Sequence, residues 1–140
     1  MKPFALFLLV AAAWSAAACK STTSPTVNVP FSQTDLRVGT GAEAVAGRRL
    51  TVNYTGWLYD ASKTDNKGAQ FDTSIGKTPY QFNVGRGEVI RGWDQGVPGM
   101  KVGGARRLII PPDLGYGSTP NGTIPANSTL VFDIDLLAVQ

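Results

Sequence analysis

The chain has 140 residues, 13 of them basic and 10 acidic, and it contains no histidine and a single cysteine, Cys19. The absence of histidine excludes a Ser-His-Asp or Cys-His nucleophilic site, and one cysteine forms neither a structural zinc site nor an internal disulfide. The length suits one domain with its own core, and a net charge of +3 from scattered residues predicts no nucleic-acid partner.

The first residues have the pattern of an export signal. A basic start is followed by an almost wholly apolar run over residues 4–18, which is too short to span a bilayer and fits a signal peptide. The run ends in Ala16-Ala17-Ala18 before Cys19, which resembles a bacterial lipoprotein processing site, although a larger aliphatic residue usually stands where Ala16 is. We expect a signal peptide over 1–18 and lipidation of Cys19; ordinary secretion with cleavage after Ala-x-Ala stays open.

The segment after the cysteine is predicted to be a flexible tether. Residues 19–33 are rich in Ser, Thr and Pro, which leaves residues 34–140 as the folded domain. Lys20, rather than an aspartate, follows Cys19, which favours the outer membrane by the sorting pattern of Gram-negative lipoproteins. We expect a periplasmic protein that touches the outer membrane only through a lipid on Cys19; a soluble periplasmic or secreted protein is the alternative.

The first half of the domain is predicted to contain two strands and a long loop. Residues 48–59 alternate, with Leu50, Val52 and Tyr54 on one face, which predicts a strand. Residues 60–70 are polar and are predicted to be a long loop, and residues 80–84 alternate again as a short strand.

The second half adds a helix and two strands. Ile90, Trp93 and Val97 fall on one helix face, and Pro98-Gly99 ends that helix. A strand is predicted over 105–110, a loop over 113–128 and a last strand over 129–139. Together the segments predict an α+β fold, in which an antiparallel sheet wraps around one short helix.

Two pairs of basic residues lie on these predicted strands. Arg48-Arg49 and Arg106-Arg107 are interpreted as part of a solvated face. Contact between these pairs and a membrane would instead indicate a lipid-anchored structural protein, which is the remotest of the functions considered.

Aromatic residues gather at the ends of elements and in loops. Tyr116 lies between two glycines in the last predicted loop, and Phe71, Tyr80 and Trp93 also lie near element ends. This pattern indicates a shallow aromatic pocket for an apolar ligand, while an isolated surface tyrosine is the alternative for Tyr116.

Six short motifs occur in a recognisable order. They are VNYTG at 52–56, FDTS at 71–74, GRGEVIRGWDQGV at 85–97, PDLGYG at 112–117, IP at 124–125 and TLVFD at 129–133. In this order the chain resembles the FKBP-type peptidyl-prolyl cis-trans isomerases over residues 34–140. The resemblance implies an antiparallel sheet of five or six strands curved around one helix, with a pocket between sheet and helix.

The resemblance also implies roles for individual residues. Trp93 corresponds to the pocket floor, and Asp72 and Tyr116 to polar side chains that hydrogen-bond a ligand. With Tyr54, these are the residues expected to carry catalysis. The positions implied for substrate binding are Phe71, Tyr80, Phe82, Glu88, Val89, Ile90, Ile124 and Phe132. The backbone of Glu88 and the N–H of Ile90 match positions that hold a bound peptide or macrolide.

Three departures from the family pattern stand out. The loop over 60–70 is longer than in small cytosolic members, and Asn121-Gly122 replaces residues that often tune ligand contacts. Gly76 or Lys77 stands where an arginine often pairs with the site aspartate, so the anchoring of Asp72 is open.

The implied reaction suits a site without histidine or metal. Rotation about an Xaa-Pro bond breaks no covalent bond, so an apolar pocket that favours the twisted amide is sufficient. We expect proline-containing polypeptides as substrates, macrolides as candidate inhibitors, no cofactor or metal, and a monomer, because only a tether precedes the domain. A non-catalytic chaperone or binding module with the same fold is the alternative. Asp72 either acts on the twisted carbonyl electrostatically or orders Tyr54.

Overall fold

The computed structural model describes residues 28–140, so the predictions for the signal peptide and for Cys19 lie outside the described residues. The elements are β1 (Ser32–Arg37), β2 (Arg49–Tyr59), β3 (Lys67–Thr73), β4 (Tyr80–Asn83), α1 (Arg91–Gly96), β5 (Ala105–Ile110), the 3₁₀ turn η1 (Pro112–Leu114) and β6 (Leu130–Val139). Within this part of the chain, no helix has the length and apolar character needed to cross a bilayer.

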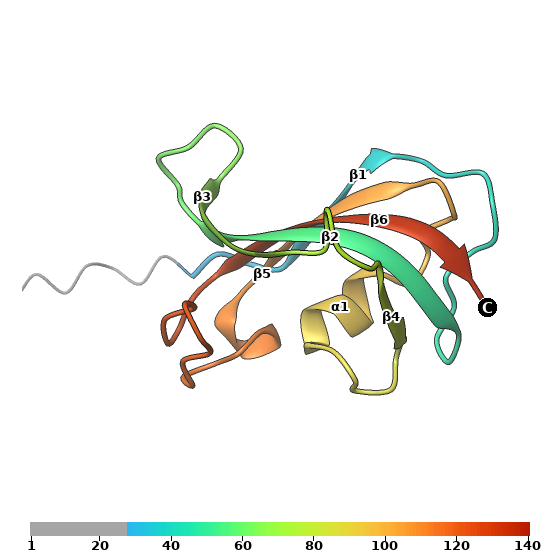
Figure 1. Cartoon of the computed structure of the whole chain (residues 1–140). Coiled ribbons are helices and arrows are strands. Elements are labelled where there is room, and N and C mark those ends of the chain that lie inside the picture. The colour runs from blue at the N-terminus through green and yellow to red at the C-terminus, as the bar shows by residue number, and fades with distance from the viewer. Residues whose placement is uncertain (1–27) are drawn as a thin grey trace, which may run out of the picture.

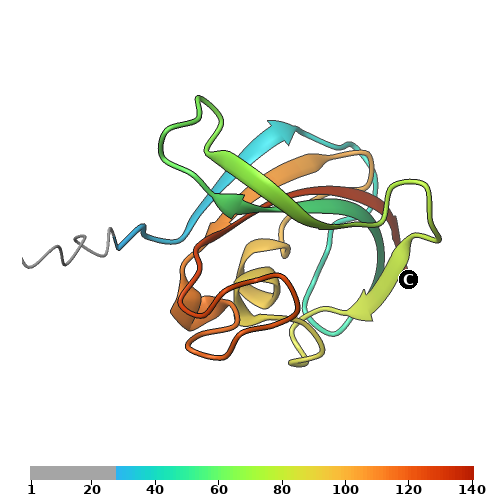
Figure 2. The same ribbon diagram turned by 60° about the vertical axis from the view of Figure 1, so that its left-hand side comes forward.

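The strands form one six-stranded antiparallel sheet that curves around the helix (Figure 1). Its order is β1-β5-β6-β2-β3, and β4 pairs with β2 outside this path. The long strand β2 pairs with both β3 and β4 along the same edge: residues 49–52 pair with β4 and residues 55–59 pair with β3. Turned by 60°, the model shows α1 inside the concave side of the sheet, beside the loop that precedes β6 (Figure 2). The predicted α+β fold is confirmed.

The core lies between the concave face of the sheet and the helix. On β2 the alternating residues Leu50 and Val52 are fully buried, as the period-two pattern predicted. On β6 the apolar face, which includes Phe132 and Ile134, is buried against them. Removing this surface from water is the main favourable term in folding.

The helix depends on these contacts for its stability. It has only six residues, far fewer than an isolated helix needs in water. Trp93 and Val97 are buried, as predicted, whereas Ile90 precedes the first turn. Glycine at position 92 lets the helix lie directly on β5, because a Cβ there would come within 2.6 Å of the Ile110 side chain.

Two strands of the sheet were not predicted from the sequence pattern. The segment predicted as a loop over 60–70 contains the start of β3, which begins at Lys67 and pairs with β2. Likewise β1 begins at Ser32, two residues before the predicted start of the domain, and all of its residues are exposed. Neither strand has an apolar alternation in its sequence. Backbone pairing to a neighbouring strand holds both, and on β3 Phe71 also packs against the core.

The interpretation of Arg106 as a solvated residue is wrong. Its side chain is buried, donates through Nε to Asp35 of β1 at 2.7 Å, and donates through Nη1 to the carbonyls of Gly96 and Pro98 at 2.8 and 3.1 Å. One guanidinium therefore joins β5, β1 and the end of the helix. A planar group with five N–H donors satisfies several partners at once, which a sequence pattern of paired arginines does not reveal.

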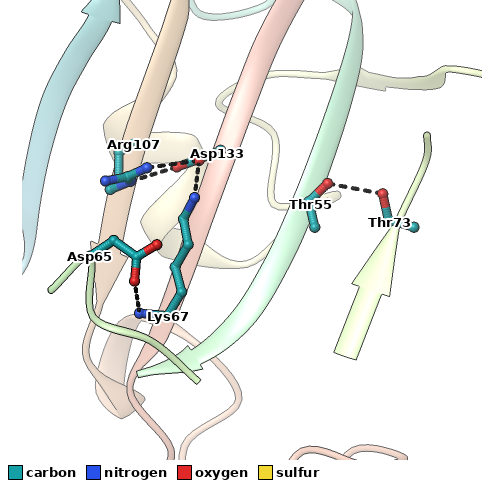
Figure 3. Close-up of polar contacts among 6 residues, drawn as sticks. All are labelled: Thr55, Asp65, Lys67, Thr73, Arg107 and Asp133. Carbon is teal, nitrogen blue, oxygen red and sulfur yellow. Dashed lines mark hydrogen bonds and ion pairs between the residues drawn. The ribbon is translucent and has the colours of Figure 1, made fainter. Parts of the chain in front are cut away.

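A second ion cluster ties β3 to the centre of the sheet (Figure 3). Asp133 of β6 accepts from Arg107 Nε and Nη2 at 2.7 and 2.9 Å, and its Oδ2 lies 2.8 Å from Lys67 Nζ. The Lys67 ammonium also lies 4.1 Å from the centre of the Trp57 ring. Burial alone would raise the pKa of Asp133, but the two cations outweigh it and hold that pKa below its usual value.

We expect Asp133→Asn to lower the free energy of unfolding at pH 7 by about 1–3 kcal/mol, because two partly buried cations lose their charged acceptor. A lowered carboxylate pKa stabilises the fold above the ordinary value of 3.8 and stops doing so as the pH falls through the lower folded value. The difference between wild type and variant, measured by urea unfolding, should therefore shrink below about pH 4.

The matched control is Asp135→Asn, which breaks the exposed pair with Arg37 and should change stability by at most about 1 kcal/mol. A difference for Asp133→Asn that grows on acidification would contradict the assigned direction.

Candidate active site

A pocket of about 370 Å³ opens between the concave face of the sheet and the segment that leads into the helix. The sheet contributes five lining residues from four strands, and the remainder come from α1, the segment before it and the last loop. The lining residues are Tyr54, Phe71, Asp72, Tyr80, Glu88, Val89, Ile90, Trp93, Tyr116 and Phe132. All of these residues were predicted to belong to the site, and the fold brings them together.

Trp93 forms the buried floor of the pocket and is held by other aromatic rings. Its ring meets Tyr54 edge-on at 5.1 Å between centres and Phe132 edge-on at 5.3 Å. Such edge-to-face pairs each add about 0.5–1.5 kcal/mol beyond the burial of their surface. Because three strands and the helix meet at this ring, the floor is fixed before any ligand arrives.

A glycine makes room for the aromatic wall. Gly56 of β2 is buried, and a Cβ at this position would lie 2.6 Å from the Phe71 ring and 2.8 Å from the Phe132 ring. Those two rings themselves meet edge-on at 5.4 Å. Any larger residue at 56 would push them apart, so this glycine sets the width of one side of the pocket.

The side chain of Asp72 holds Tyr54 in place. The Tyr54 hydroxyl donates to Asp72 Oδ2 at 2.6 Å, and the Thr73 N–H donates to Asp72 Oδ1 at 2.8 Å. Burial, followed by this hydrogen bond and the nearby charge, raises the pKa of Tyr54 well above its usual value. Asp72 is therefore placed to order the ring that contacts Trp93.

Tyr116 stands at the mouth of the pocket and is not an isolated surface residue. Its loop is held by hydrogen bonds from the Gly117 N–H to the Pro112 carbonyl and from the Asn127 N–H to the Gly117 carbonyl, both at 2.8 Å. Partial burial raises the pKa of Tyr116, against an opposing hydrogen bond with Asn121. A protonated hydroxyl is thus available as a donor at the rim.

Two predicted binding residues lie elsewhere than expected. Phe82 does not line the pocket; it is 2% exposed and stacks behind Tyr80 at 5.7 Å, against Trp93. Ile124 lines an adjacent hollow of about 190 Å³, which shares Phe71, Asp72 and Tyr116 with the main pocket. Both residues therefore support or extend the wall instead of forming it.

Two residues that contact the pocket wall were not predicted. Asn83 of β4 donates to Glu88, and Asp94 of the helix accepts from Gly85 and Gly87, so both bind the segment that supplies Glu88, Val89 and Ile90. The available signal was an acid in the first helical turn after the glycine-rich stretch 85–87. Among residues 28–140, no group of three metal-binding side chains is arranged to hold an ion.

Relatives with the same domain are found among bacteria and fungi. Residues 41–137 match the family model described as FKBP-type peptidyl-prolyl cis-trans isomerase. An FK506-binding protein of Neisseria meningitidis serogroup A is 46% identical over 107 residues, covering 75% of this chain and 92% of that protein. FK506-binding protein 1 of Aspergillus oryzae is 45% identical over 106 residues, covering 73% of this chain and 91% of that protein.

Solved structures agree with the sequence relatives. The crystal structure of AtFKBP13 superposes with a TM-score of 0.67 at 38% identity, covering 79% of this chain and 93% of that chain. FkpA from Escherichia coli gives a TM-score of 0.65 at 38% identity, and the match covers 79% of this chain but 48% of FkpA. The matched domain holds the whole aromatic pocket, and the chain belongs to the FKBP-type peptidyl-prolyl cis-trans isomerases.

Proposed function

We propose that this isomerase accelerates Xaa-Pro bond rotation in exported proteins, and that the reaction takes place in the aromatic pocket above Trp93. The observation that carries the proposal is the pocket itself: a tryptophan floor that is 4% exposed and walls that are mostly aromatic, with Asp72, Glu88 and Tyr116 as polar lining residues. Such a site encloses a proline ring and removes water from the amide beside it.

The chemistry follows from what resists the rotation. Amide resonance gives the Xaa-Pro bond a barrier of about 20 kcal/mol, and the planar amide is better hydrated than the twisted one. Transfer into an apolar pocket therefore costs the planar form more than the twisted form, which lowers the barrier. No proton has to move, which suits a pocket in which the Tyr54 and Tyr116 hydroxyls have a raised pKa.

Two donors at the rim supply orientation. The Tyr116 hydroxyl is one, and the backbone N–H of Ile90 is the other; the carbonyl of Ile90 already accepts from the Trp93 N–H at 3.0 Å. A substrate whose carbonyls bind these donors keeps its proline ring over Trp93. Holding the reacting bond in one place removes part of the entropic barrier.

We further propose that the domain works close to a membrane in the periplasm, tethered by a lipid on Cys19. The sequence of residues 1–20 supports this proposal. Twelve residues separate Cys19 from the start of β1 at Ser32, which limits the reach of the domain to about 45 Å from the anchor. Its substrates would then be chains that fold at or near that surface.

Replacing the pocket floor should impair the reaction. We expect Trp93→Leu to lower kcat/KM for a Leu-Pro test peptide by at least about tenfold, the equivalent of roughly 1.4 kcal/mol of transition-state stabilisation. A protease-coupled or NMR exchange assay measures it. The matched control is Trp57→Leu, which removes a tryptophan that contacts Lys67 away from the pocket and should leave kcat/KM unchanged. A wild-type protein that leaves the isomerisation rate unchanged would point to a non-catalytic binding module.

The Tyr54–Asp72 pair can be tested by a double-mutant cycle. We expect Tyr54→Phe and Asp72→Asn to show a coupling of about 1–2 kcal/mol in unfolding free energy, because the bond joins a hydroxyl to a carboxylate. Tyr59→Phe serves as the control on the same strand. Additive effects of Tyr54→Phe and Asp72→Asn would show that the hydrogen bond does not hold the ring.

The anchor has a direct test in the intact mass of the mature protein. We expect a chain that begins at Cys19 and carries a diacyl or triacyl increment, and Cys19→Ser should abolish membrane fractionation. A mature chain with an unmodified thiol, or one cleaved elsewhere, would overturn the lipid anchor and leave the isomerase proposal untouched.

A further inference from the structure

The segment between β4 and the helix builds one wall of the pocket, yet little in its sequence makes it rigid. Gly85 and Gly87 have φ values of +81° and +71°, the left-handed region that glycine adopts without strain. Glycine also leaves the backbone more freedom to lose on folding than any other residue. Directly after this pair come Glu88, Val89 and Ile90, which line the pocket. The wall is therefore as well defined as the contacts that hold these two glycines.

One carboxylate provides those contacts. Asp94, in the first turn of α1, accepts from the Gly85 N–H through Oδ1 at 2.8 Å and from the Gly87 N–H through Oδ2 at 2.9 Å. Its own N–H donates to the Ile90 carbonyl at 3.3 Å. A single residue thus holds the segment at three points. Hydrogen bonds to an ionised acceptor are roughly twice as strong as those between neutral groups.

These bonds are not an ordinary helix cap. The capping position is Ile90, which makes no side-chain cap hydrogen bond, and the Asp94 carboxylate reaches N–H groups outside the helix. The bonds therefore fix a neighbouring segment instead of satisfying the helix's own first turn.

A second carboxylate secures the other end of the wall. Glu88 accepts from the Asn83 side-chain amide at 2.9 Å and from the Asn83 N–H at 2.6 Å. The hydrogen bond from the Asn83 side chain, then that from its backbone, lowers the pKa of Glu88. The segment is consequently fastened to β4 on one side and to the helix on the other.

We propose that Asp94 is a positioning residue of the isomerase, which sets the distance between the pocket floor and the wall formed by residues 88–90. Asp94 directly follows Trp93, so the residue that carries the floor and the residue that holds the wall are neighbours on one helix turn. Misplacing a binding group by about 1 Å is enough to weaken a site strongly. The inference rests on the proposed function, because it takes this pocket as the place where substrate binds.

The test uses Asp94→Asn in the full chain, since asparagine keeps the shape and one acceptor oxygen but replaces the second oxygen with a donor. We expect KM for the Leu-Pro test peptide to rise about five- to tenfold, the effect of weakening one or two hydrogen bonds, while kcat changes by less than about twofold. Amide hydrogen exchange at Gly85 and Gly87 should accelerate. Asp94→Glu keeps both acceptor oxygens on a longer side chain, so its KM should lie between those of Asp94→Asn and the wild type.

The control is Asp133→Asn, which lowers stability from the outer ion cluster and should keep the wild-type KM. The inference is overturned if Asp94→Asn keeps the wild-type KM in an active enzyme, or if both variants raise KM alike. It is also overturned if exchange at Gly85 and Gly87 stays slow. A wild-type protein without isomerase activity would overturn the proposed function instead, and the exchange rates would still show whether Asp94 holds the segment.

Discussion

The packing of Trp93 against the concave face of the sheet is the contact on which both the fold and the pocket depend. A helix of six residues is not stable in isolation. The packing of its Trp93 ring against the sheet therefore both holds the helix and forms the core. In the proposed function the same ring is the surface on which a proline would rest. The residue that stabilises the fold is then also the floor of the pocket, which is a part of the core that the sheet's curvature leaves open on one side.

The sequence predicted the parts of the fold that are held by burial. The alternation of Leu50 and Val52 and of the residues on β6 identified the central strands, because one face of each had to leave water. The outer strands β1 and β3 were not predicted, because backbone pairing and ions from distant segments hold them. The ion pair between Arg106 and Asp35 joins residues far apart in the sequence, so a local sequence pattern does not predict it.

In the site, too, some residues could be predicted from the sequence and others could not. Residues that line the pocket were identified from motifs, but motifs do not reveal depth, so the side chain of Phe82 was placed on a wall that it only supports. The role of Asp94 was not predicted, because its partners are backbone N–H groups, which every residue except proline has. The departure at Lys77 left the anchoring of Asp72 open, and the Tyr54 hydroxyl supplies that anchor at 2.6 Å.

The outer strands β1 and β3 have a consequence for how the molecule meets other chains. Every residue of β1 is exposed, five of its six residues are polar, and its pairing with β5 shifts register between Asp35 and Arg37. The pairing of β2 with β3 shifts twice. Bulged, polar edges are poor templates for a further strand, so β1 and β3 are unfavourable places for an extended polypeptide to pair with the sheet.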